Sequence, residues 1–155
     1  MFSIRQISIL FIIVFAVFFS CKKESNLPPQ PAIKFLDFTQ RPDSGFLRLS
    51  FTDGDGDINL SREDTNFNFF IRYFEKRGGT YSELFLRPPL NYRIRDINPT
   101  VQKKPLEGII KVKWKAPYYN PFLRNGDTIR YDFYLVDIAG NTSNTETTGD
   151  IIIRK

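Results

Sequence analysis

From residue 32 onward, apolar side chains recur at every second position, which is the period of a β-strand with one buried face. In FLRLSFT (46–52), for example, Leu47, Leu49 and Phe51 alternate with polar residues. The pattern predicts seven strands, at 32–39, 46–52, 66–76, 80–86, 107–115, 127–137 and 147–155. No stretch has a convincing helical period. We therefore expect an all-β, antiparallel sandwich of about seven strands.

The same alternation predicts which side chains face the core. The third strand is expected to turn its aromatic and branched residues inward, namely Phe67, Phe69, Ile71 and Tyr73. In 107–115 the inward set is Ile110, Val112 and Trp114, between outward lysines. The alternation slips within 32–39, which predicts a β-bulge.

Residues 1–20 have the character of an export signal. Arg5 is their only charge, and the stretch 7–19 is apolar except for Ser8. A run of this length is shorter than the roughly 20 residues that a membrane-spanning helix needs. A positive start before a short apolar run predicts a secretory signal.

The stretch FFSCKKE, around the single cysteine, Cys21, resembles a bacterial lipoprotein signal of the Bacteroidota type. Ser20 matches the small residue that precedes the cysteine in that family, whereas Phe18 and Phe19 depart from its usual pattern. The resemblance implies cleavage before Cys21, acyl chains (such as palmitate) on that residue, and, with Lys22 next, sorting to the outer membrane. It leaves open which side of that membrane the protein faces. The alternative is an incidental cysteine beside another kind of signal.

This interpretation divides the chain into a signal peptide (1–20), a lipidated cysteine with a proline-rich tether (21–31) and one domain (32–155). Without the signal, which carries one positive charge, the net charge falls from +5 to +4. That mild excess suits phosphate head groups or acidic glycans better than nucleic acid. Cys21 is the only thiol, so we expect no disulfide within the domain.

The stretch YDFYLVDIAGNTSN (131–144) resembles the F strand and F–G loop of bacterial immunoglobulin-like and fibronectin type III domains. The matching positions are Tyr131, Phe133, Leu135, Asp137, Ala139, Gly140, Asn141 and Ser143. The resemblance implies an immunoglobulin-like β-sandwich in which the B–C and F–G loops lie at the same end.

An acidic loop follows the second predicted strand, where Asp53, Asp55 and Asp57 alternate with Gly54 and Gly56. Glycine lets the backbone curl through positive φ and gather the carboxylates, and Ca²⁺ would offset their repulsion. The spacing does not fit an EF-hand, because Ile58 stands where that motif needs glycine. If the loops meet as the resemblance implies, Asp137 and Asn141 would complete the site. The alternative is a solvated turn that uses Asp and Gly for its geometry.

Catalysis is not expected. The chain has no histidine, which excludes a Ser-His-Asp triad and a histidine zinc site. Glycoside hydrolysis needs two acids at a set separation, whereas the acids here cluster in one loop.

A binding module is the favoured class of function. Tyr118, Tyr119 and Phe122 lie in the proline-rich stretch 116–126 and are candidates for stacking on a glycan or anchoring a protein partner. The alternative role of these rings is to cap the core. The sequence therefore predicts a lipid-anchored envelope module that binds a glycan or a protein. The other possibility is an accessory subunit of an outer-membrane assembly with no ligand site of its own.

Overall fold

The structure is a computed structural model that describes residues 27–58, 64–95, 104–115 and 119–155. Within these ranges the chain forms eight β-strands and no helix, in agreement with the predicted all-β class. The strands are β1 (Ala32–Arg41), β2 (Ser44–Asp53), β3 (Phe69–Arg77), β4 (Thr80–Leu84), β5 (Leu106–Lys115), β6 (Thr128–Leu135), β7 (Glu146–Thr147) and β8 (Ile151–Ile152).

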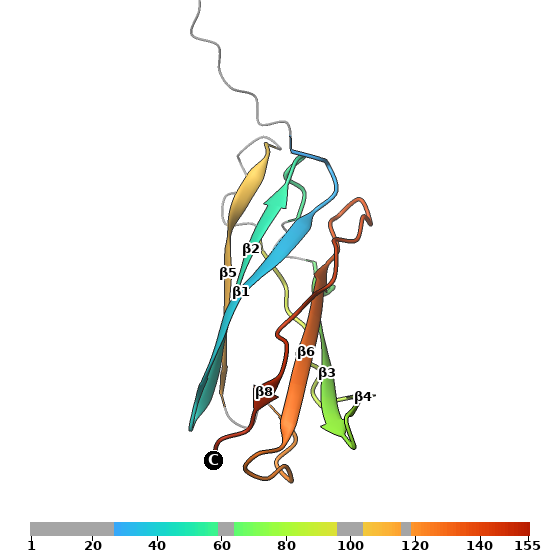
Figure 1. Cartoon of the computed structure of the whole chain (residues 1–155). Coiled ribbons are helices and arrows are strands. Elements are labelled where there is room, and N and C mark those ends of the chain that lie inside the picture. The colour runs from blue at the N-terminus through green and yellow to red at the C-terminus, as the bar shows by residue number, and fades with distance from the viewer. Residues whose placement is uncertain (1–26, 59–63, 96–103, 116–118) are drawn as a thin grey trace, which may run out of the picture.

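The strands form two antiparallel sheets. The first sheet has the order β1-β2-β5, and the second has the order β4-β3-β6-β7, with β8 also paired to β6. Figure 1 shows the two sheets as facing layers of an elongated body, with the acidic loop at the upper end of β2. Segment 27–31 enters at that same end, whereas the C-terminus lies near the opposite end.

The core lies between the two sheets and is built by the predicted alternation. β6 is the clearest case, because Ile129, Tyr131, Phe133 and Leu135 are fully buried while the residues between them are only partly buried. Leu47 and Leu49 of β2 face them from the first sheet and are equally buried. Full burial of a large apolar side chain contributes about 1.5–3 kcal/mol, so these residues supply much of the force that joins the layers.

The first strand contains the predicted bulge. The pairing of β1 with β2 shifts register between Phe35 and Asp37, so that Leu36 has no opposite partner and is exposed. Past the bulge, Phe38 turns inward and its ring lies 5.8 Å from that of Trp114. The extra residue keeps the apolar side chains of both halves of β1 on the core face.

Two details of the strand prediction were wrong. The third strand begins at Phe69 rather than residue 66, and Phe67 is 42% exposed, with the guanidinium of Arg93 over its ring, instead of lying in the core. The last strand is two short pieces. Between them the backbone of Tyr131 is held by Thr148, whose Oγ1 accepts from Tyr131 N and whose N donates to Tyr131 O. A side chain thus replaces part of the strand ladder there.

Candidate functional site

The acidic loop and the loop after β6 meet at the upper end of the sandwich. The N–H of Ile138 donates a hydrogen bond of 3.1 Å to the carbonyl oxygen of Asp57, which joins the two loops directly. The N–H of Val136 donates to the carbonyl oxygen of Asn68 at 2.9 Å, at the base of the same loops. The acidic loop and the loop after β6, which the sequence analysis combined into one site, are therefore neighbours.

Three of the five predicted ligands converge at this junction. Asp53, Asp57 and Asp137 each place one carboxylate oxygen within 4.8 Å of the others, and all three side chains are buried. Because Ca²⁺ binds oxygen at about 2.3–2.6 Å, two ligands of one ion lie at most about 5 Å apart. The spacing of the three carboxylates therefore fits a single hard cation.

Asp53 is the most constrained of the three. Its side chain is 0% exposed, and Oδ2 accepts a hydrogen bond of 2.9 Å from the N–H of Ile58. Within the described part of the chain, Oδ1 is buried without a hydrogen-bond partner. Burial, with smaller contributions from the carboxylates of Asp55 and Asp57, raises the pKa of Asp53 to about 6. A buried acceptor without a donor is a position that a cation would satisfy.

The other two predicted ligands have different places. Asp55 is half-buried and lies close enough to raise the pKa of Asp53, but it is not one of the three converging carboxylates. Asn141 is exposed, and its amide donates to Asp137 from both Nδ2 (2.8 Å) and the backbone N (2.7 Å). Asn141 therefore orients the carboxylate of Asp137 within its own loop.

Both glycines of the acidic loop lie against other backbone segments, Gly56 against the carbonyl oxygen of Lys104, but only one of the two has a positive φ. Gly56 has a φ of 74°, the left-handed conformation expected of a curling loop. A Cβ at Gly54 would instead lie 2.2 Å from the carbonyl oxygen of Leu27 and 2.3 Å from that of Pro28. Gly54 is therefore needed for close approach of the tether rather than for a positive φ.

The end of the predicted tether is docked onto both loops of the acidic cluster. The N–H of Gly54 donates to the carbonyl oxygen of Pro28 at 2.9 Å, and Nε2 of Gln30 donates to the carbonyl oxygen of Thr142 at 2.5 Å. Pro31 is buried. The segment that links Cys21 to the domain thus reaches it beside the candidate cation site. Cys21 itself lies outside the described residues.

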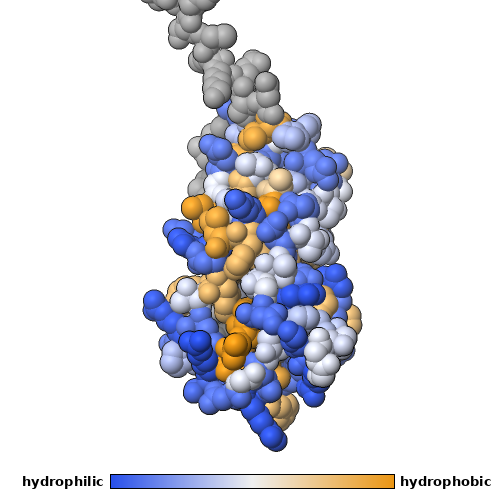
Figure 2. All heavy atoms as spheres, in the orientation of Figure 1, coloured by the Kyte–Doolittle hydropathy of each residue, from blue (hydrophilic) through white to orange (hydrophobic). Residues whose placement is uncertain are grey.

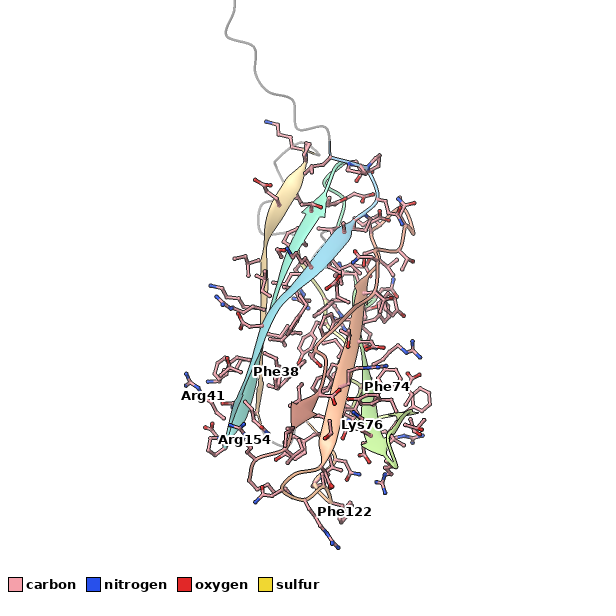
Figure 3. All side chains as sticks on the ribbon, viewed as in Figure 1. Phe38, Arg41, Phe74, Lys76, Phe122 and Arg154 are labelled. Atoms are coloured by element: carbon pink, nitrogen blue, oxygen red, sulfur yellow. The ribbon has the colours of Figure 1, made fainter. Side chains whose placement is uncertain are left out.

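The predicted aromatic ligand site is not assembled in the described residues. Tyr119 is half-buried and packs against the core, as the capping alternative proposed. Phe122 is 89% exposed and points away from the body at its lower end (Figure 3). Tyr118 lies outside the described residues. Phe122 therefore belongs to the end of the sandwich opposite the acidic cluster.

A buried polar cluster that the sequence did not reveal holds this lower loop. Glu75 of β3 is buried, and its carboxylate accepts from Tyr73 Oη (3.0 Å), Asn120 Nδ2 (2.9 Å) and an Arg77 guanidinium nitrogen (2.7 Å). Burial acts to raise the pKa of Glu75, but these hydrogen bonds outweigh burial and hold its pKa below the usual value. The alternation of β3 places residue 75 inward, and this is the one sequence signal that could have found it.

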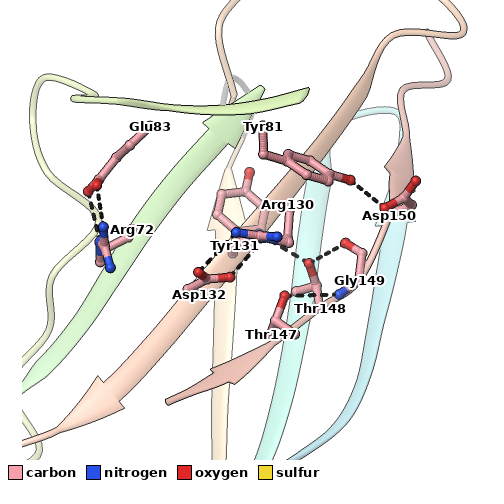
Figure 4. A network of polar contacts seen from close by, with 10 residues as sticks. All are labelled: Arg72, Tyr81, Glu83, Arg130, Tyr131, Asp132, Thr147, Thr148, Gly149 and Asp150. Carbon is pink, nitrogen blue, oxygen red and sulfur yellow. Dashed lines mark hydrogen bonds and ion pairs between the residues drawn. The ribbon is translucent and has the colours of Figure 1, made fainter. Parts of the chain in front are cut away.

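Charged groups on the outer face of the second sheet are mutually paired (Figure 4). Arg72 pairs with Glu83, and Arg130 with Asp132 at 3.0 Å. Asp150 accepts from Lys76 at 2.7 Å and from the hydroxyl of Tyr81. Phe74 is covered on this face by the guanidinium of Arg130 at 4.6 Å and is buried.

Comparison with known proteins adds no relative. No protein family, curated protein or solved structure matches this chain. In the described ranges, no helix has the length and apolar character needed to cross a bilayer.

Proposed function

We propose that this protein is a lipid-anchored, non-catalytic binding module of the bacterial outer membrane, built on an immunoglobulin-like sandwich. The observation that carries the proposal is the docking of segment 27–31 onto the upper loops through Gly54 and Gln30. An acylated Cys21 a few residues upstream would hold that end near the membrane. The lower end and the sides of the sandwich would then be presented to a glycan or protein partner.

The strand grouping supports an immunoglobulin-like assignment. In this chain, β1, β2 and β5 share one sheet, as strands A, B and E do in an immunoglobulin domain. The strands β3, β6 and the last pair, β7 and β8, share the other sheet, as strands C, F and G do. β4 pairs with β3 and so extends the C side. With this assignment, the two loops of the acidic cluster are the B–C and F–G loops.

We further propose that Ca²⁺ stabilises the membrane-proximal end through Asp53, Asp57 and Asp137. The three buried carboxylates and the unpartnered Oδ1 of Asp53 support this assignment. The ion would brace both loops that contact the tether. Its role would be structural, because the chain has no histidine and its acids are gathered at one point rather than across a cleft.

Membrane fractionation tests the anchor. The wild-type protein should be found in the outer-membrane fraction, and mass spectrometry should show acyl chains on Cys21. Cys21→Ser should move the protein out of that fraction, whereas Ser20→Ala, which keeps a small residue before the cysteine, should not. A Cys21→Ser protein that stays with the membrane would contradict the lipid anchor.

Thermal unfolding tests the cation separately. The midpoint of the purified protein should rise with millimolar Ca²⁺ and fall after addition of a chelator. Asp137→Asn should abolish the difference, whereas Asp64→Asn, at an acid outside the cluster, should keep it. Equal midpoints with Ca²⁺ and with chelator would remove the cation from the proposal.

A further inference from the structure

Among the described residues, side chains from outside its sheet bond to the outer edge of β1 in its upper half. β1 pairs with β2 on one side and is the edge strand of the first sheet. In its upper half, the side chain of Asn144 exchanges two hydrogen bonds with the backbone of Ile33, both at 2.9 Å, and Glu146 accepts from the N–H of Phe35 at 3.0 Å. These side chains occupy the backbone groups that another strand would pair with.

Below this seal, a groove opens between the lower half of β1 and the C-terminal segment. It has a volume of about 630 Å³, and its apolar lining includes Phe38, Ile151 and Ile152, of which Ile152 is 53% exposed. Figure 2 shows hydrophobic surface along a band of this face, over the seam between the two sheets. Exposed Ile152 thus lies beside half-buried Phe38 and buried Ile151, both of which belong to the core or pack against it.

The rim of the groove is basic. Arg41, Arg154 and Lys155 line it, and Figure 3 places Arg41 and Arg154 together at the lower end of β1. The one acid in the lining, Asp150, is already paired with Lys76 and Tyr81. The groove therefore presents an uncompensated positive charge beside an apolar floor.

A polar group in the lining also lacks a partner. Nε2 of Gln40 is buried, and no hydrogen-bond acceptor for it is found in the described part of the chain. A buried amide donor without an acceptor costs free energy. Gln40 lies on β1 itself, below the stretch that Asn144 and Glu146 cover.

We propose that this groove binds a short, extended, acidic segment of a protein partner, which adds as a strand to the lower half of β1. An edge strand binds such a segment through backbone hydrogen bonds, which supply affinity. Every second side chain of the segment contacts the surface beside the strand, and these contacts supply specificity. One face of the segment would cover Ile152 and Phe38, while its acids would meet Arg41, Arg154 and Lys155. The stretch 38–41 of β1 has room for about four residues at roughly 3.3 Å each. A second copy of this chain is a poorer occupant, because the same basic side chains would face each other.

This inference rests on the proposed function only in treating the protein as a binding module. It does not depend on the lipid or on the cation. The test therefore uses purified full-length protein in detergent, with and without chelator, so that failure of the groove is distinguishable from failure of the anchor or of the cation site.

The probe is a fluorescent, capped octapeptide of alternating glutamate and valine. We expect saturable binding that weakens at least tenfold in the double variant Arg41→Glu/Arg154→Glu. The matched control, Lys34→Glu, changes the charge of an exposed residue in the sealed half of β1 and should bind the peptide as the wild type does. Unfolding midpoints of all variants would establish that they are folded.

A second probe separates strand addition from simple charge attraction. The same peptide with every backbone nitrogen methylated keeps its charge but has no N–H group on either edge to donate to a strand, and it should bind at least tenfold more weakly. Absence of saturable binding up to millimolar peptide would overturn the proposal. Equal binding of the two peptides, or an equal effect of Lys34→Glu, would do so as well, and would assign the interaction to charge alone.

Discussion

The N–H of Gly54 donates a hydrogen bond to the carbonyl oxygen of Pro28 at 2.9 Å, and thereby joins the incoming tether to the acidic loop. One residue before Gly54 is the buried carboxylate of Asp53. The attachment of the domain and its candidate cation site are therefore parts of one local structure.

Gly54→Ala should detach the tether. The added Cβ would lie 2.2–2.3 Å from two carbonyl oxygens of the backbone, which cannot yield as a side chain would. We expect a loss of about 1–3 kcal/mol in the free energy of unfolding, together with faster proteolysis at 27–31. Urea denaturation and limited proteolysis measure the two effects. Gly149→Ala is the control, because Gly149 has open space around it, so that any cost there comes from its positive φ of 68° and not from a clash with the tether. Tether proteolysis raised equally by both variants would contradict the steric explanation.

The effect of Asp53→Asn on stability should have opposite signs in chelator and in saturating Ca²⁺. In chelator, the raised pKa of Asp53, about 6, means that its ionised form is disfavoured in the folded protein. The contribution of protonated Asp53 to the stability of the fold is complete below the pKa of the unfolded state and is lost as the pH rises through about 6. At pH 7.5 in chelator, Asp53→Asn should therefore stabilise the fold, and the gain should shrink as the pH falls.

In saturating Ca²⁺ at the same pH, Asp53→Asn should instead destabilise the fold, because the variant loses a charged ligand. Unfolding midpoints from pH 4.5 to 7.5, with and without Ca²⁺, would show this crossing. If Asp53→Asn shifts the unfolding midpoint from that of the wild type by the same amount with and without Ca²⁺, a role for Asp53 in binding the ion would be contradicted.

Glu75→Ala should loosen the lower loop. Removal of the carboxylate leaves Tyr73 Oη and Asn120 without their acceptor, which costs about 1–3 kcal/mol. Because the pKa of Glu75 is held below its usual value, the stabilisation is present above the unfolded pKa and is lost as the pH falls through the folded pKa. The variant and the wild type should thus differ most at neutral pH and converge in acid, as urea unfolding at several pH values would reveal. Glu107→Ala, at an exposed acid of β5, is the control. A pH-independent difference would contradict the ionised role of Glu75.

The double variant Asn144→Ala/Glu146→Ala should promote self-association. Its loss of three hydrogen bonds to β1 would expose the backbone of Ile33 and Phe35 as an open sheet edge. Sedimentation velocity should show larger species that increase with concentration. Thr145→Ala, between the two positions and itself exposed, should stay like the wild type. A double variant that sediments as the wild type does would show that the seal is dispensable.

The alternation of apolar residues determined most of the architecture. Leu47 and Leu49, and the four inward residues of β6, could be assigned because a strand turns successive side chains to opposite faces. The slip in the first strand correctly indicated a bulge. The prediction for Phe67 was wrong because the apolar alternation extends to residues that precede the start of β3. The pattern alone does not show at which residue the hydrogen bonds between strands begin.

The candidate site could be predicted from the sequence only through the spacing of the aspartates in the acidic loop and the resemblance of stretch 131–144 to immunoglobulin-like domains. The Asp-Gly alternation marked a loop that could gather charge, but only the packed structure decides that Asp53, Asp57 and Asp137 meet and that Asp55 does not. The reason for Gly54 was equally invisible, because it depends on the carbonyl oxygens of Leu27 and Pro28.

By itself, then, the sequence determined the β-strands, their inward faces and the candidate chemistry of one loop, since these follow from neighbours along the chain. Tertiary structure alone decided which edges are sealed, where Asn144 and Glu146 bind β1, and where a groove remains. These features join residues about 110 positions apart. Local periodicity carries no information about such pairs, because they are set by how the two sheets pack.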